Sequence, residues 1–354
     1  MSSNKNFNDR LKAILLTLFV FTFSGISFAQ TTCDAVPQEI LIALTNQNDL
    51  PAISTQYQLE PTPLGQIGNP AIYRMKFLAA NTQTPCAVAT AMQGDARISQ
   101  VETNRSVKLV QNSGLAWSQG RSWSVGRSWS VGGSSKAYNG QWFREMINLD
   151  QAHSVSTGKG VVVAILDTGI DRTHPALQDK IIPGYDFVDN DDDPSEEGII
   201  RQNPSFGHGT HVAGIVRAVA PDAEIMPLRI LDENGEGSLW RIKDALIWAA
   251  THSGNKPIIV NMSFAYPIEV QNGNNRFLHD LLDGCDGVED PGERPIPEFQ
   301  GKQLILTASA GNGGGIPGRT GGEKLYPAAE RVESLSNIIS VGASNRFDKL
   351  SDFS

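Results

Sequence analysis

Three polar side chains that could together provide a general base and an oxyanion donor lie at the ends of predicted strands and helices of this sequence. Asp167 comes directly after the apolar run 160–166 (GVVVAIL), and Asn312 follows the run 303–310 (QLILTASA). His208 lies in a GHGTH segment at the start of a predicted helix. A carboxylate can orient a histidine, the histidine can act as a general base, and an amide can stabilise an oxyanion. Taken singly, an aspartate at a strand end is usually a cap, and a lone histidine is usually a polar surface group.

The elements that must position these side chains alternate between strands and helices. Apolar runs typical of buried strands occur at 160–166, 223–231, 256–264, 303–310 and 337–343. Between them, helices are predicted at 208–219 and from the N-cap residue Ser238 onward. This alternation indicates an α/β fold with a doubly wound, mainly parallel sheet. Sites in such sheets form outside the carboxyl ends of the strands, so Asp167, His208 and Asn312 are expected to converge at one edge.

Four ordered motifs carry these residues, and together they resemble the motifs of the subtilisin-like serine endopeptidases (peptidase S8 family). They are VVAILDTGID (162–171), GHGTHVAGI (207–215), NMS (261–263) and SAGN (309–312). The resemblance covers roughly residues 142–354. It implies catalytic roles for Asp167, His208 and the oxyanion donor Asn312, with no cofactor required for catalysis. A zinc site is not expected, because the HxxH segment from His208 to His211 lacks the spacing and the glutamate of HExxH.

The resemblance also implies how a protein or peptide substrate is bound. An extended peptide is held as an added strand between two edges of a cleft. These edges are expected to be Gly235, Glu236 and Gly237 on one side and Ser263, Phe264 and Ala265 on the other. Ala265 stands where the family commonly has glycine, so its methyl group could narrow the pocket. The alternative is that these are ordinary loop residues.

The first residues and the overall charge limit the location and the partners of the chain. Residues 1–29 combine the basic Lys5 and Arg10, an apolar run at 11–23 and small residues up to Ala29, which is typical of a secretory signal peptide. We therefore expect secretion, and no stable membrane anchor, because the run is shorter than the ~20 residues that span a bilayer. The net charge of −9 argues against a nucleic-acid partner.

Composition divides the rest of the chain into three parts. Residues 30–112 look like a small α+β domain, 113–140 is a Gly/Ser/Trp linker with a tandem GRSWSV repeat, and 141–354 is the peptidase domain. By resemblance, 96–109 (ARISQVETNRSVKL) forms the closing strand and tail of a propeptide, which assists folding and acts as an intramolecular inhibitor. The alternative is an independent N-terminal binding domain. Cys33 and Cys86 could form a disulfide bond, and Cys285 would then be the remaining cysteine.

A dense run of aspartates precedes the histidine motif, in residues 185–194 (YDFVDNDDDP). Hard carboxylate oxygens suit Ca²⁺, and so many uncompensated charges in one loop would repel each other. By resemblance to thermostable relatives, Asp186, Asp189 and Asp191 are the expected ligands of a structural calcium. The alternative is a solvated acidic turn.

The nucleophile of the family lies in a GTSMA-like motif, and no such sequence occurs among these 354 residues. The chain as written is therefore expected to be inactive and to be cut short before the catalytic serine. Two functions are compatible with the motifs. One is a secreted subtilisin-like serine endopeptidase that hydrolyses peptide bonds in proteins, and the other is a non-catalytic, secreted peptide-binding remnant of the same fold. A reading frame that continues past Ser354 into a GTSMA-like motif would favour the first.

Overall fold

The computed structural model describes residues 33–109, 140–199, 202–203, 205–267, 276–286, 296–302, 304–311, 325–328, 337–344, 347 and 349. The predicted signal peptide, almost all of the predicted linker and the oxyanion candidate Asn312 lie outside these residues. From Asp34 onward the chain belongs to one compact unit. Within the described part of the chain, no helix is both long and apolar enough to cross a membrane.

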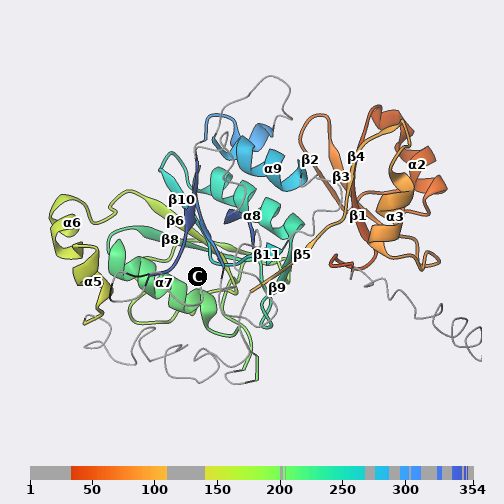
Figure 1. Ribbon diagram of the computed structural model, residues 1–354. Coiled ribbons are helices and arrows are strands. Elements are labelled where there is room, and N and C mark those ends of the chain that lie inside the picture. The colour runs from red at the N-terminus through yellow and green to blue at the C-terminus, as the bar shows by residue number, and fades with distance from the viewer. Residues whose placement is uncertain are drawn as a thin grey trace, which may run out of the picture. The chain divides into compact units, whose positions relative to one another are not determined.

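The N-terminal part is an α+β arrangement built on a four-stranded antiparallel sheet in the order β2-β3-β1-β4 (Figure 1). Its strands are β1 (Glu39–Leu44), β2 (Gly65–Ile67), β3 (Ile72–Lys76) and β4 (Ile98–Glu102). Helices α2 (Leu50–Gln56) and α3 (Pro85–Met92) pack on the sheet, and a short 3-10 turn, η2 (Gln47–Asp49), precedes α2. The part has a hydrophobic core of its own around Ile40, Met75 and Met92. Cys33 and Cys86 are both disulfide-bonded, while the Cys285 thiol is buried and donates to the Leu281 carbonyl.

The larger part contains the parallel sheet that the sequence predicts, with six strands in the order β14-β12-β10-β6-β8-β7. The strands are β6 (Val162–Asp167), β7 (Tyr185–Asp186), β8 (Glu224–Arg229), β10 (Ile258–Met262), β12 (Leu304–Ser309) and β14 (Ile338–Val341). Every pair of neighbours in this sheet is parallel. The central strand β6 is buried along its whole length, which explains its continuous apolar run.

Helices cover both faces of this sheet (Figure 1). They are α7 (His208–Val219) on one face and α8 (Leu239–His252) and α9 (Arg276–Asp283) on the other. The larger part also contains the helices α5 (Phe143–Met146) and α6 (Leu149–Val155) and the 3-10 turns η4 (Gly284–Asp286) and η5 (Pro297–Phe299). Val162 and Ala164 of β6 join the core under α8 and α9, whereas Val163 joins the core under α7. Alternate residues of one strand therefore serve opposite layers, and the doubly wound prediction is confirmed.

Short strands complete the fold at the edge where α8 begins. They form two antiparallel pairs, β5 (Ser106–Lys108) with β9 (Glu236–Ser238) and β11 (Tyr266–Pro267) with β13 (Leu325–Tyr326). The Ser238 side chain accepts a hydrogen bond from the Arg241 amide at 3.3 Å, so Ser238 is the N-cap of α8, as predicted.

Candidate active site

Asp167 and His208 meet at the carboxyl edge of the parallel sheet. Asp167 ends the central strand β6, and His208 is the first residue of α7. The Nδ1 atom of His208 lies 2.6 Å from Oδ1 of Asp167, and both residues are buried. The same Oδ1 atom accepts a hydrogen bond from the Thr168 amide at 2.8 Å. With Nδ1 bound to the carboxylate, Nε2 is the ring atom that is left to accept a proton.

A glycine allows the helix that carries His208 to come this close to the strand that carries Asp167. A Cβ atom added at Gly209 would lie 2.1 Å from the carbonyl oxygen of Gly169, a distance that real side chains do not reach. Gly207, which precedes the helix, has a φ of 93°, in the left-handed region that favours glycine. The GHG pattern is therefore a requirement of the backbone at this edge, as well as of the chemistry.

Neighbouring charges favour the protonated form of His208. Burial alone would lower the pKa of His208, but the charge of Asp167, its hydrogen bond and the charge of Glu196 outweigh burial and raise this pKa above its usual value. The imidazolium that forms when His208 accepts a proton is thus stabilised. Burial, with the charge of His208 added, lowers the pKa of His211 to about 3, so His211 stays neutral at physiological pH.

The third predicted residue of the catalytic set, Asn312, lies outside the described residues. Strand β12, which leads to it, runs parallel to β10 and ends at Ser309. Its carboxyl end therefore lies at the same edge as the end of β6, because β6 and β12 both pair in parallel with β10. The structure thus brings Asp167 and His208 together and describes the strand that precedes Asn312.

The two predicted substrate edges have a strand of the same chain between them. Strand β5 pairs antiparallel with β9, with Val107 opposite Gly237, and Lys108 also bridges to Ala265. The Leu109 amide donates to the carbonyl oxygen of Gly235 at 2.9 Å. Val107 has no exposed surface and belongs to the main core. Figure 1 shows β5 beside β9, so β5 lies as an added strand between the two predicted edges.

The predicted edge residues Ser263 and Phe264 take up structural positions beside Ala265. The Ser263 hydroxyl accepts a hydrogen bond from the Asn261 side chain at 2.8 Å, and the Phe264 ring is buried in the main core. The Phe264 carbonyl accepts a hydrogen bond from the Ser309 hydroxyl at 3.3 Å, which ties this edge to β12.

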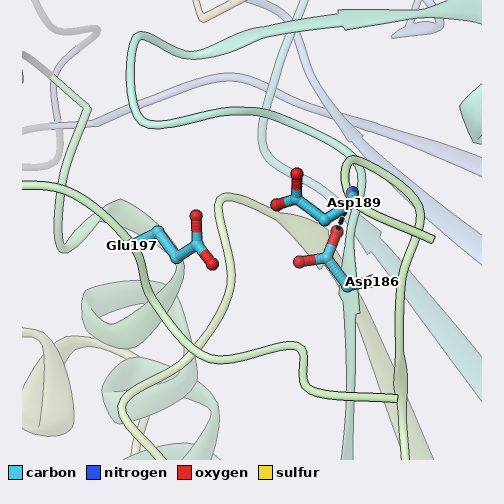
Figure 2. Close-up of side chains that lie close together, drawn as sticks. All are labelled: Asp186, Asp189 and Glu197. Carbon is cyan, nitrogen blue, oxygen red and sulfur yellow. Dashed lines mark hydrogen bonds between the residues drawn. The ribbon is translucent and has the colours of Figure 1, made fainter. Parts of the chain in front are cut away.

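The acidic loop contains a cluster of carboxylates, but its members differ from the predicted set. Oxygen atoms of Asp186, Asp189 and Glu197 all lie within 4.8 Å of one another, and Figure 2 shows the three side chains converging. The Asp191 carboxylate instead accepts the Asp193 amide at 3.0 Å, and the backbone of Asp191 pairs with Asp186. The sequence analysis missed Glu197, because nothing in the local pattern distinguishes it from an exposed loop glutamate.

A buried arginine provides the positive charge for this cluster. One guanidinium nitrogen of Arg229 lies 2.6 Å from both Asp186 and Asp189, and the other lies 3.1 Å from Glu197. The Arg229 side chain is only 1% exposed. The remaining oxygen of Asp186 accepts the amides of Val188 and Asp189. Both oxygens of Asp186 are therefore engaged, whereas Asp189 and Glu197 each contact Arg229 through one oxygen. A Ca²⁺ ion in this arrangement would have to share these ligands with the guanidinium.

Fold and site together define a peptidase-like α/β protein in which aspartate precedes histidine along the chain. Residues 158–354 match the model of the subtilase family (Peptidase_S8), and the chain belongs to this family. The predicted family and its α/β fold are thereby confirmed.

Relatives and a solved structure agree with this assignment. The chain is 35% identical over 216 residues to the thermophilic serine proteinase of Bacillus sp. (strain AK1), covering 58% of this chain and 44% of the relative. It is 30% identical over 224 residues to thermitase of Thermoactinomyces vulgaris, covering 60% and 66%. The chain thus spans less than two thirds of either relative. Fervidolysin from Fervidobacterium pennivorans, described as a keratinolytic enzyme related to subtilisin, shares the fold with a TM-score of 0.54 and 21% identity, covering 83% of this chain and 42% of that one.

Proposed function

We propose that this chain is part of a secreted serine endopeptidase that hydrolyses peptide bonds in proteins. The observation that carries this proposal is the buried pair of Asp167 and His208, 2.6 Å apart at the carboxyl edge of the sheet. A serine hydroxyl attacks the peptide carbonyl, Nε2 of His208 takes the proton, and Asp167 holds the ring in the correct tautomer. Asn312 donates its amide to the oxyanion. The secreted location rests on the predicted signal peptide.

Casein hydrolysis tests this proposal. The nucleophilic serine is not assigned among residues 1–354, so the assay uses the protein translated from its whole reading frame. We expect the release of acid-soluble peptides, and we expect a fluorophosphonate, which modifies activated serines, to stop it. Hydrolysis that continues at full rate after treatment with the fluorophosphonate would contradict the serine mechanism. Binding of peptides without any hydrolysis would favour the non-catalytic remnant.

We further propose that residues 30–112 are a propeptide that inhibits the enzyme by occupying its substrate cleft. Strand β5 lies between the edge at Gly235–Gly237 and Ala265, where the substrate strand is proposed to bind. The same part of the chain also satisfies the first amides of two helices of the larger part. The side-chain oxygen of Asn104 accepts the Trp240 amide of α8 at 3.2 Å, and a Glu102 oxygen accepts the Phe277 amide of α9 at 3.0 Å.

Purified residues 30–112, added to the mature protease, should inhibit it, and Val107→Asp should weaken this inhibition by about 100-fold. The reason is that the Val107 side chain is fully buried, and placing a carboxylate there costs ~3 kcal/mol. Lys108→Gln is the matched control, because the ion pair from Lys108 to Glu236 is half exposed on both sides and is worth ~0–1 kcal/mol. The measurement is the inhibition constant against a chromogenic peptide. If the wild-type segment does not inhibit, residues 30–112 are an independent binding domain.

We also propose that Arg229, rather than Ca²⁺, stabilises the acidic loop. The support is that its guanidinium contacts Asp186, Asp189 and Glu197 from a buried position. A Ca²⁺ ion at this point would have to share its ligands with a like charge. The proposed peptidase chemistry uses only side chains and draws on no cofactor.

A further inference from the structure

Glu196 accepts hydrogen bonds from the threonine hydroxyls of both predicted catalytic motifs. It lies in the loop between β7 and α7, two residues after the acidic run 185–194. Its Oε1 atom accepts the Thr168 hydroxyl at 2.6 Å. Its Oε2 atom accepts the Thr210 hydroxyl at 2.9 Å and the Thr210 amide at 3.2 Å. Thr168 directly follows Asp167, and Thr210 lies two residues after His208, so this carboxylate bridges the aspartate motif to the histidine motif.

Each of these two hydroxyls also accepts a hydrogen bond from a backbone amide of the other motif. The Thr168 hydroxyl accepts the amide of Gly209, the residue after His208, at 3.0 Å. The Thr210 hydroxyl accepts the amide of Asp171, in the loop after Asp167, at 2.8 Å. A threonine hydroxyl has only one proton to donate, and Glu196 accepts it in both cases. The carboxylate thereby sets the direction of both hydroxyls, which leaves their lone pairs free for the amides of the opposite motif.

Without Glu196, the Thr168 hydroxyl has a second acceptor close to the reaction. Oδ1 of Asp167 lies 3.3 Å from the Thr168 hydroxyl, and it is the same atom that binds Nδ1 of His208. A proton that turned toward Asp167 would compete with the histidine for this oxygen. Glu196 therefore keeps the hydroxyl from weakening the contact between Asp167 and His208.

We propose that Glu196 is a positioning residue of the peptidase, which holds Asp167 and His208 in place through the hydroxyls of Thr168 and Thr210. This inference rests on the proposed peptidase function. Glu196 acts through the threonines and does not touch the reacting atoms.

The charge of Glu196 supports the proposal. Burial raises the pKa of Glu196 to about 7, with the charge of Asp167 adding to the effect and the threonine hydrogen bonds opposing it. Among the described residues, the titratable groups that act on His208 are the acidic Asp167 and Glu196 and the neutral His211. Removing the negative charge of Glu196 lowers the pKa of His208, so the neutral base persists to lower pH. Above about pH 7, where Glu196 is mainly charged, the acid limb of the pH profile of kcat/KM should then move to lower pH.

The test compares Glu196→Gln with wild type in the protein translated from the whole reading frame. We expect kcat for a peptide substrate to fall on the order of 10–100-fold, with KM nearly unchanged, because the dyad is displaced while the substrate edges stay intact. We also expect the acid limb to shift to lower pH. Glu197→Gln is the matched control, since Glu197 is half exposed and contacts Arg229 instead of the threonines, and its acid limb should not move.

Substitutions at Thr168 keep the proposal testable if Glu196→Gln folds poorly. Thr168→Val removes the hydroxyl and should lower kcat to a similar extent, whereas Thr168→Ser keeps it and should restore kcat to near the wild-type value. A Glu196→Gln enzyme with wild-type kcat and an unmoved acid limb would overturn the proposal, even if its Tm is lower. So would equal kcat values for Thr168→Val and Thr168→Ser. These results leave wild-type hydrolysis intact, whereas failure of the proposed function would appear as a wild-type protein without hydrolysis.

Discussion

Replacing His208 with alanine should lower kcat for peptide hydrolysis by about 10⁶-fold, the size of the loss known for the subtilisin triad. The variant lacks the Nε2 atom that accepts the proton of the serine, and no other described group takes its place beside Asp167. KM should change far less, because the proposed substrate edges around Gly235 and Ala265 do not involve the imidazole. The measurement is kcat and KM for a chromogenic peptide, with the protein translated from the whole reading frame.

Two further variants test whether the loss of kcat is specific to His208. Asp167→Asn preserves the shape of the partner but favours the wrong tautomer of the ring, so kcat should fall ~10⁴-fold. His252→Ala is the matched control, because His252 is exposed at the end of α8, where it stacks on Trp248. It should retain the wild-type kcat. A His208→Ala enzyme within tenfold of wild type would contradict the proposed mechanism.

Replacing Arg229 with methionine should produce a large loss of stability away from the proposed catalytic pair. The change leaves Asp186, which is 1% exposed, and its neighbours Asp189 and Glu197 without their counter-charge. Breaking a buried ion pair by removing one partner costs ~3–5 kcal/mol of unfolding free energy. In a domain of this size, that corresponds to a fall in Tm of about 10 °C. Calorimetry measures the change in Tm.

A control variant and a calcium titration distinguish stabilisation of the acidic loop by Arg229 from stabilisation by a bound metal. Arg172→Met removes a guanidinium that pairs with Asp193 in the same loop, but this pair is about half exposed and is worth ~0–1 kcal/mol. A chelator should leave the Tm of the wild-type protein unchanged, whereas added Ca²⁺ should raise the Tm of Arg229→Met, because its carboxylate oxygens become available. A wild-type Tm that falls on chelation would show that calcium, and not Arg229 alone, stabilises the loop.

The parts of the fold that depend on local pattern could be predicted from the sequence. The helix predicted at 208–219 is α7, residue for residue, because helical spacing and the preceding glycine mark its start. The strand predicted at 223–231 is shorter, since β8 ends at Arg229. Ile230 and Leu231 are apolar and buried, but their amides both turn to the carbonyl oxygen of Asp167. An apolar run therefore identifies the strand but not the residue at which the strand ends its pairing with its neighbour.

The parts of the site that depend on tertiary pairing could not be predicted. Arg229 meets Asp186 because β7 and β8 are neighbours in this register, which no local pattern reveals. The pairing of β5 with β9 joins segments about 130 residues apart in the sequence. Glu196 lies two residues after the acidic run, and its sequence neighbours do not show that its carboxylate turns toward two threonines.

The most direct test of the proposed serine mechanism is the number of fluorophosphonate groups that each chain takes up, measured by intact mass after the proposed propeptide has been removed. The protein is translated from the whole reading frame, as wild type and as His208→Ala. We predict one phosphonyl group per wild-type chain, on a serine, and a rate of labelling in His208→Ala that is lower by orders of magnitude, because Nε2 no longer activates the hydroxyl. A folded wild-type protein that takes up no label, or a His208→Ala variant that labels as fast as wild type, would contradict it.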